Sequence, residues 1–246
     1  RGVAPAQAAG SLGARGDAAR PGLAKVTALT GAASHGSNAP AAGAGGGYVL
    51  DIGSDGAGGV AAVGAFSSIG GQTRRNVARL DGTTGNAIGG FDPGIDYGYA
   101  LRVLANPDDT YLIAGPYSSL GGGEHLALGR LLADGSVDAN FNPSLESPGF
   151  GYVIERLPTP GAFVVGGRFV HANGLIRRNL FKLSLPGVVD PNWIANTDEE
   201  VRALAVDAVG RIYVSGYFTR VGGVVRPYMA GRQSTTDGAV ASAWSS

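Results

Sequence analysis

The stretch Val63-Gly64-Ala65-Phe66 returns three more times along the chain, as Ala114-Gly115-Pro116-Tyr117, Gly166-Gly167-Arg168-Phe169 and Ser215-Gly216-Tyr217-Phe218. The aromatic residues that end these copies are spaced by 51, 52 and 49 residues. A second aromatic series keeps the same period at Phe91, Phe141, Trp193 and Trp244. Two independent markers with one period of about 51 residues indicate a repeat architecture, and periods of this size are typical of propellers and solenoids.

The copy between residues 99 and 150 shows the internal plan of the repeat. It contains four short β-prone segments, at residues 100–104, 110–114, 126–132 and 137–141. Turn formers separate them, notably Asn106-Pro107-Asp108-Asp109 and the tight-turn pair Asp134-Gly135. The Gly-rich segment 118–124 is expected to form a loop. Four antiparallel strands in one such repeat are the plan of a β-propeller blade.

We therefore expect an all-β fold, a β-propeller of about five blades with four antiparallel strands in each repeat. Four blades are predicted at about 49–98, 99–150, 151–199 and 200–246, all within one domain.

The first 48 residues are the weakest copy. Leu23-Ala24-Lys25-Val26 resembles Val77-Ala78-Arg79-Leu80, but residues 1–22 carry no strand signal. The first blade, 1–48, is thus expected to be partial or degenerate, and an open fragment of a larger ring is the alternative. Because the chain starts at Arg1 rather than Met, we also expect a processed form or a part of a longer protein.

The recurring aromatic residues have a structural explanation. Blades pack face to face, so both faces of each sheet need large apolar side chains at equivalent places. Both aromatic series are therefore predicted to lie in the core and not to stack on a ligand.

The composition excludes several classes of function. Nineteen basic and nineteen acidic residues cancel, and charged residues make up 15% of the chain, below the roughly 25% of ordinary globular proteins. Nucleic-acid binders usually carry a basic excess, so no nucleic-acid partner is expected. The absence of Cys excludes disulfides, thiolate nucleophiles and Cys-based metal sites. No apolar run is long enough to span a bilayer, so membrane insertion is not expected.

Three segments together resemble a bacterial repeat family. They are Gly64-Ala65-Phe66, Arg74-Arg75-Asn76-Val77-Ala78-Arg79-Leu80-Asp81 and Asp134-Gly135-Ser136-Val137-Asp138-Ala139-Asn140-Phe141. With them the chain is similar to the delta-sixty repeat β-propellers of large secreted or surface proteins, well over residues 49–246 and poorly over 20–40. The resemblance implies an extracellular or cell-surface bacterial location and supplies no catalytic residues. The chain departs from the pattern at Gly231, where a basic residue is expected, and at Glu124-His125, which replace an Arg pair.

Charged residues on the innermost strands form one candidate site. Gly47-Tyr48, Gly98-Tyr99 and Gly151-Tyr152 align, and the residues three places after each Tyr are Asp51, Arg102 and Glu155. The innermost strand of a propeller blade borders the central channel, so these side chains could bind a polar ligand or a cation. The alternative, which we favour, is a set of ion pairs between blades.

The recurring arginines are candidates for a second site. Arg74-Arg75, Arg177-Arg178 and Arg226 occupy equivalent loop-to-strand positions and could together bind anions. Because a residue type that recurs in every copy points to maintenance of the blade, we expect these arginines to bond loop carbonyls or a neighbouring Asp.

No metal site or cofactor is predicted. His35, His125 and His171 fall at non-equivalent positions without metal-ligand spacing, and His125 is expected to be exposed. Residues 51–56 and 134–138 offer oxygen atoms that could hold Ca²⁺, but hairpin turns explain both segments better.

The leading functional hypothesis is a non-catalytic extracellular module that mediates protein–protein or subunit contacts, by self-association or with a protein partner. The low charge suits packing into a bacterial surface assembly, because interface cores are depleted of charged residues. An incomplete first blade would also leave a strand edge for another chain.

Two alternatives remain. The first is carbohydrate binding, through loops with Asp96, Tyr97 and Tyr99, or through Trp193 with Asn196. The second is a glycosidase- or lyase-like enzyme, whose active site would draw single carboxylates from several blades and leave no linear motif. The available carboxylates are Asp96, Glu124, Glu146, Asp198, Glu199 and Glu200.

Overall fold

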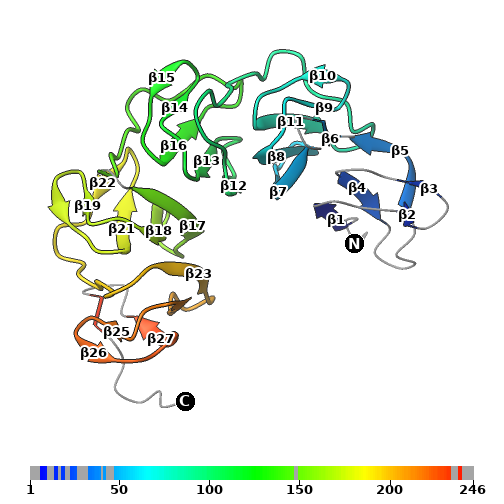
Figure 1. Cartoon of the computed structure of the whole chain (residues 1–246). Helices are drawn as coiled ribbons and strands as arrows, with labels where there is room; N and C mark the ends of the chain where they lie inside the picture. Colours follow the sequence, from blue (N-terminus) through cyan, green and yellow to red (C-terminus); the bar gives the residue numbers. More distant parts are fainter. Residues whose placement is uncertain are drawn as a thin grey trace. The chain divides into compact units, whose positions relative to one another are not determined.

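The structure is a computed structural model that describes residues 47–146, 149–233 and 238–239, together with six strands before residue 47 (Figure 1). Every regular element in these described parts is a β-strand, and the strands pair in antiparallel fashion. The predicted all-β class is therefore confirmed. No helix among the described residues is long and apolar enough to cross a membrane.

Four main sheets follow residue 47, and each is named here after its first strand. The β7 sheet has the order β7 (Tyr48–Ser54), β8 (Gly59–Ala65), β11 (Val77–Asp81). The β12 sheet has the order β12 (Arg102–Ala105), β13 (Tyr111–Ala114), β16 (Leu128–Leu131). The β17 sheet has the order β17 (Phe150–Arg156), β18 (Ala162–Arg168), β21 (Leu180–Ser184), β22 (Val188–Val189). The β23 sheet has the order β23 (Val201–Val206), β24 (Ile212–Gly216), β27 (Met229–Gln233).

Strands described before residue 47 form a sheet of the same order. Its strands are β1 (Ala6–Ala9), β4 (Leu23–Val26) and β5 (Ala33–Ala39), with a hairpin of β2 (Ala14–Arg15) and β3 (Ala18–Ala19) between them. The predicted strand at Leu23–Val26 is confirmed. Residues 1–22, which carry no strand signal in the sequence, contain β1, β2 and β3. β1 pairs with β4 along its whole length, because ladder hydrogen bonds need only the backbone and not β-branched side chains.

The predicted fourth strand is shorter than expected. Among the described residues only the β17 sheet has one, β22. The equivalent segments of the β7 and β12 sheets form single bridges, Leu80 with Ala87 and Leu131 with Val137. In the β12 sheet the Asp138 carboxylate accepts the Asn140 N–H at 3.0 Å, which turns the chain out of the ladder after one bridge.

The Gly-rich loop predicted at 118–124 contains a short hairpin, and so do the equivalent segments of the other main sheets. The pairs are β9 (Ser68–Ile69) with β10 (Gln72–Thr73), β14 (Ser119–Leu120) with β15 (Gly123–Glu124), β19 (His171–Ala172) with β20 (Leu175–Ile176), and β25 (Arg220–Val221) with β26 (Val224–Val225). β6 (Ala41–Ala42) pairs with β9. In β14–β15 the turn residues Gly121 and Gly122 have φ of 61° and 78°, as a two-residue type I′ turn requires.

The chain divides into two compact units. The first comprises Arg1–Ile113, Ser119–Glu124 and Arg130–Val137, and the second Ala114–Ser118, His125–Gly129 and Asp138–Ser246. The boundary runs through the β12 sheet. Within the first unit β7 lies beside β1 and β12, and within the second unit β17 lies beside β23. First strands of consecutive sheets are therefore neighbours inside each unit.

The aromatic series lie where the sequence predicted. Phe66, Tyr117, Phe169 and Phe218 are at most 4% exposed, and Phe91, Phe141 and Trp193 at most 1%. Trp244 lies outside the described residues. In the second unit one apolar cluster includes Trp193, Phe218, Val153 and Val201, and so joins the β17 and β23 sheets. The burial of Trp193 also removes it as a sugar-stacking residue, which corrects that version of the carbohydrate hypothesis.

One backbone position recurs with a left-handed conformation just before the third strand of each main sheet. It is occupied by Asn76, Ala127, Asn179 and Tyr228, whose φ values are 67°, 65°, 64° and 65°. Asn tolerates this conformation better than Ala or Tyr. Asn179 also accepts the Phe169 N–H at 3.1 Å and donates to the Thr197 carbonyl at 3.2 Å, both in buried surroundings.

We predict that Asn179→Ala lowers the free energy of unfolding by about 2–3 kcal/mol, because two buried hydrogen bonds are lost and Ala is strained at positive φ. The reciprocal change, Ala127→Asn, is expected to raise it by about 1 kcal/mol. Urea unfolding of both variants measures this. Asn140→Ala, at an exposed Asn, is the control and should change it by less than about 0.5 kcal/mol. Equal effects of the two Asn→Ala changes would contradict the assignment.

Candidate functional site

Asp51 and Arg102 meet in the first unit, on the neighbouring strands β7 and β12. Arg102 Nη1 lies 3.6 Å from Asp51 Oδ1, and the Val103 N–H donates to Asp51 Oδ2 at 2.9 Å. Burial raises the pKa of Asp51 above its usual value, against the opposing effects of the Val103 hydrogen bond and the Arg102 charge. The geometry is that of an ion pair between consecutive sheets, which is the interpretation favoured from the sequence.

Glu155 occupies a different register from the one that the sequence alignment gave it. β7 and β17 each contain a bulge, and the residue directly after the bulge is Asp51 in β7 and Val153 in β17. Glu155 lies two residues beyond Val153, half-buried in the second unit. The alignment was wrong because Tyr152 is itself the bulged residue and corresponds to Leu50, not to Tyr48.

Asp96 already has partners in its own unit. Its carboxylate forms an ion pair with Arg75 and accepts the Ser119 hydroxyl at 3.4 Å. Asp96 is therefore held between the loop that carries it, the start of β11 and the β14 hairpin.

Tyr97 and Tyr99 lie on the same loop as Asp96 and are exposed, Tyr97 by 72% and Tyr99 by 39%. The Asn76 side chain fixes this loop, since its amide donates to the carbonyls of Ile95 at 3.2 Å and Gly98 at 3.0 Å. Two tyrosine rings thus stand on a loop whose backbone is held in place.

The recurring arginines bond loop carbonyls, as the sequence favoured. Arg74 and Arg177 are each only 5% exposed. Arg74 Nη2 donates to the carbonyls of Ile88 and Gly89, both at 3.0 Å, and Arg177 Nη2 donates to two carbonyls of its own repeat at 2.9 and 2.8 Å. Arg226 Nη1 donates to a neighbouring carbonyl at 3.0 Å. These guanidinium groups stabilise loops, which leaves Arg74 and Arg177 little capacity to bind an anion.

His125 takes the place of the buried arginine in the β12 sheet. Its N–H donates to the Ser118 carbonyl, as that of Arg74 does to Ser67. Contrary to the sequence expectation it is buried, with 8% exposure, and no described residue bonds its Nδ1 atom. Burial lowers the pKa of His125 below the usual histidine value.

Several carboxylates proposed for sugar hydrolysis are engaged by donors. Asp198 accepts the backbone N–H groups of Thr219 and Arg220, both at 2.8 Å, and the Thr219 hydroxyl at 2.6 Å. Burial is the largest single influence and raises the pKa of Asp198, but these hydrogen bonds together outweigh it and lower the pKa to about 2. Glu146 lies 3.1 Å from His171. Asp198 is thereby held ionised, which suits a structural acceptor better than a general acid.

The two segments that could supply oxygen atoms to Ca²⁺ use their carboxylates in turns. Asp55 accepts the Gly59 N–H at 2.6 Å, the Tyr111 hydroxyl at 2.8 Å and Arg79 Nε at 2.8 Å. Asp134 accepts the backbone N–H and the hydroxyl of Ser136. Over the described ranges, no three His, Asp or Glu side chains gather at metal-binding distance.

A group that sequence reasoning did not assemble lies in the second unit. We call Tyr152, Glu200, Arg202 and Tyr217 the tyrosine–arginine cluster. The Arg202 guanidinium carbon lies 4.3 Å from the centre of the Tyr152 ring and 5.4 Å from that of Tyr217. Arg202 Nη2 donates to Glu200 Oε1 at 2.7 Å. Burial and the charge of Glu200 raise the pKa of Tyr152, and the bond to Glu200 raises the pKa of Arg202.

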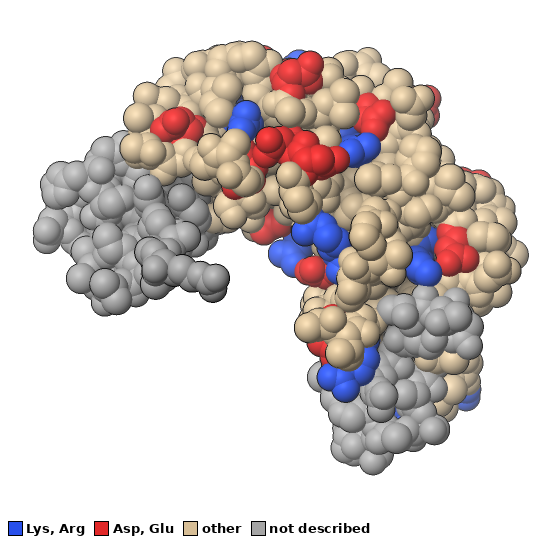
Figure 2. Space-filling model, turned by 180° about the vertical axis from the view of Figure 1, so that it is seen from behind, with Lys and Arg blue, Asp and Glu red and all other residues tan. Residues whose placement is uncertain are grey.

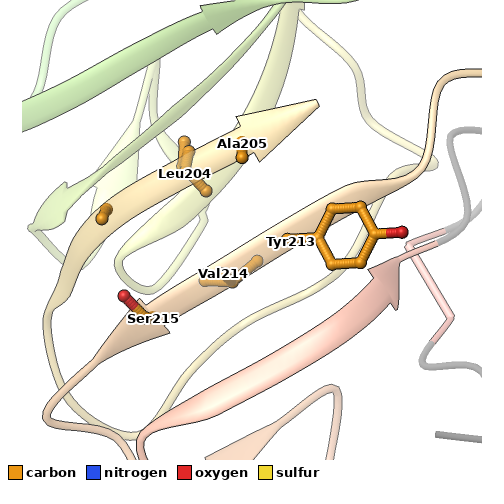
Figure 3. A pocket seen from close by; sticks show the side chains of 6 residues that line it. Leu204, Ala205, Tyr213, Val214 and Ser215 are labelled. Carbon is orange, nitrogen blue, oxygen red and sulfur yellow. The ribbon is translucent and has the colours of Figure 1, made fainter. Parts of the chain in front are cut away.

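An apolar sheet face lies next to this cluster. Ala203 pairs with Ser215 and Ala205 with Tyr213, so these four side chains share one face of β23 and β24, called the open face here. They line a shallow hollow of about 190 Å³ with the backbones of Leu204 and Val214 (Figure 3). Both alanines are exposed.

The same face is covered in the β17 sheet. Val153 of β17 occupies the register of Ala203, and Val164 of β18 occupies the register of Tyr213. These two valines are 1% and 0% exposed. β23 lies so close that a Cβ added to Gly166 would come within 2.5 Å of Val201 Cγ1. On the open face of the β23 sheet, in contrast, Ala203 and Ala205 are exposed, and Tyr213 and Ser215 are half-buried.

A family model described as a beta-propeller domain of unknown function (DUF5122) matches residues 58–83, 106–141 and 210–230. No curated protein matches the chain. The chain is similar to a β-propeller repeat family. The matched segments include β8, β13 and β24 with their turns, so the predicted repeat and propeller character of the fold is confirmed.

We predict that the protein loses stability as the pH falls below the pKa of an unfolded histidine, about 6.5, because His125 has a lowered pKa when folded. Below this pH the unfolded chain binds a proton at His125 more readily than the folded chain does. The stability that neutral His125 contributes is therefore complete above that pH and declines below it. Urea unfolding at pH 7.5 and pH 5 for the natural chain and His125→Gln measures the effect. The variant should show a smaller difference between the two pH values; an equal difference would contradict the role of His125.

Proposed function

We propose that the chain is a non-catalytic module that makes protein–protein or subunit contacts. The observation that carries this proposal is the open face of the β23 sheet. Its equivalent in the β17 sheet packs against the next sheet, while Ala203 and Ala205 are exposed in the second unit. An exposed apolar sheet face favours a cover, because apolar surface is stabilised by removal from water.

The surface chemistry agrees with this proposal. Acidic and basic side chains lie beside one another between broad uncharged areas on the face shown in Figure 2. Several large apolar side chains are also exposed, among them Tyr217 (62%), Tyr228 (64%) and Val225 (54%) in the second unit. Protein interfaces are rich in tyrosine and poor in charge at their centre.

The open face is tested with Ala205→Glu. A carboxylate there would have to be desolvated under a partner, so we expect association of the chain with itself or a partner to weaken at least about tenfold. Light scattering after size exclusion, at several concentrations, measures self-association directly. Ile176→Glu is the matched control, because it places the same charge at a residue that is 57% exposed on β20, outside the open face.

The free energy of unfolding of Ala205→Glu shows whether the open face is covered within one chain or makes contact with another molecule. If the chain is monomeric at every concentration and Ala205→Glu lowers the free energy of unfolding by more than about 2 kcal/mol, the face is covered within one chain and the proposal fails. If association weakens while the free energy of unfolding changes by less than about 0.5 kcal/mol, the face is a contact surface.

A second candidate, carbohydrate binding, is favoured by the exposed Tyr97 and Tyr99 beside Asp96. Aromatic rings on a fixed loop can stack on sugar faces while a carboxylate accepts hydroxyl groups. We expect Tyr97→Ala to abolish any signal on an array of immobilised glycans. Tyr48→Ala, at another exposed tyrosine of the same unit, should leave it unchanged, and an array without signal for the natural chain removes this candidate.

We further propose five blades, one for each of the β1, β7, β12, β17 and β23 sheets, in a protein of the delta-sixty repeat type. The support is the shared strand order of these sheets and the recurring sequence motifs. A bacterial extracellular or cell-surface location is proposed from the same resemblance.

A further inference from the structure

The tyrosine–arginine cluster is built on two β-bulges. In β17, Gly151 pairs with Gly167 and Val153 with Gly166, so Tyr152 has no partner across the strand. In β23, Val201 and Ala203 pair in the same way and leave out Arg202. Bulges re-aim single side chains and are frequent beside binding sites. Because β17 and β23 are neighbours, the two bulged residues meet.

Arg202 is fixed in place without using all of its donors. Two tyrosine rings and Glu200 hold the guanidinium group, and 46% of the side chain remains exposed. Arginine carries donors on three nitrogens. Only Nη2 has a hydrogen-bond acceptor among the described residues, so the donors of Nε and Nη1 are available to a ligand.

The surroundings favour a negative ligand. Arg168, which is exposed and opposite Phe150, acts electrostatically on Tyr152 together with Arg202. Glu200 acts on Tyr152 in the opposite sense, but its side chain is only 13% exposed. The accessible part of the cluster is therefore positively charged.

Tyr228, an aromatic residue with a strained backbone, lies beside Tyr217 of the cluster. Its backbone N–H donates to Phe218 and its carbonyl accepts from Gly216, which places it beside Tyr217. A tyrosine at φ 65° is unusual, and the equivalent Asn76 and Asn179 use their side chains to hold loops. Strained residues gather at ligand sites. Here the conformation leaves the ring 64% exposed.

We propose that the tyrosine–arginine cluster binds an aspartate or glutamate side chain of a protein partner, with Arg202 as the group that recognises the carboxylate. Guanidinium and carboxylate groups match in planar geometry, and charge-assisted hydrogen bonds are the stronger ones. The inference rests on the proposed function in protein contacts and adds the chemistry of the partner.

A carboxylate on a sugar is the competing ligand, and the ring contacts weigh against it. The Tyr152 ring already has Phe150 stacked beside it at 6.2 Å and Arg202 over it at 4.3 Å. Little of its face is left for a sugar ring. Arginine and tyrosine side by side are, in contrast, typical of the energetically dominant residues of protein interfaces.

The test is the affinity of a fluorescein-labelled deca-glutamate peptide for the full chain, measured by fluorescence polarisation, with deca-glutamine as the uncharged probe. We expect binding of deca-glutamate alone, weakened about tenfold or more by Arg202→Gln. Arg202→Lys should weaken it several-fold although the charge is kept, because an ammonium group cannot present two parallel donors. Circular dichroism and urea unfolding check that the variants fold.

Arg178→Gln is the matched control, since it removes the same charge from another exposed arginine of the second unit. The proposal is overturned by absence of deca-glutamate binding, by equal affinity in Arg202→Gln, or by an equal loss in Arg178→Gln, which would indicate attraction by net charge. Tighter binding of oligogalacturonate, lost in Arg202→Gln, would assign the site to acidic sugars instead.

Self-association measured on the same samples separates this inference from the proposed function. If Arg202→Gln binds deca-glutamate like the natural chain while Ala205→Glu still weakens association, only the carboxylate site fails. If the chain does not associate and Ala205→Glu destabilises it, the proposed contact face fails, whatever the affinity for the peptide.

Discussion

The structure depends on the close approach of consecutive sheets through their first strands. β7 lies against β12 and β17 against β23, and small residues make this distance achievable. A Cβ on Gly53 would lie 3.3 Å from the Ala105 nitrogen, and one on Gly166 would lie 2.5 Å from Val201. Dispersion and removal of apolar area from water stabilise such contacts, so each sheet needs a neighbour on both faces.

This constraint decides which residues remain free to vary. Side chains that point between sheets are fixed by packing, and the aromatic series at the strand ends are buried. Arg74 and Arg177 are fixed in another way, by carbonyls of the loops that they hold. Loop tips, such as Tyr97, and residues displaced from the ladder, such as Tyr152 and Arg202, are under neither restraint.

The sequence predicted the features that recur in every repeat, but not the contacts that depend on the register of the strands. The period predicted the buried aromatic residues, the arginines that bond loop carbonyls and the all-β class, because each follows from a residue type at a fixed spacing. The hairpins at Gly121-Gly122 and Asn173-Gly174 carry known turn signals and could have been found from the sequence. The bulges carry no such signal. They shifted Glu155 away from its expected register and brought Tyr152 to Arg202, residues 50 positions apart that meet only through strand pairing.

The bulge explains why a binding group can arise on such a regular fold. At this position the three fully described bulges carry Leu50, Tyr152 and Arg202, which share no chemistry. A bulged residue has no partner across the strand, and none of these three side chains is fully buried, so neither the ladder nor the core restricts its type closely. Two neighbouring bulges can therefore acquire a tyrosine and an arginine without loss of stability. Their side chains also start from rigid strands and not from a mobile loop, which lowers the entropy lost when a ligand binds.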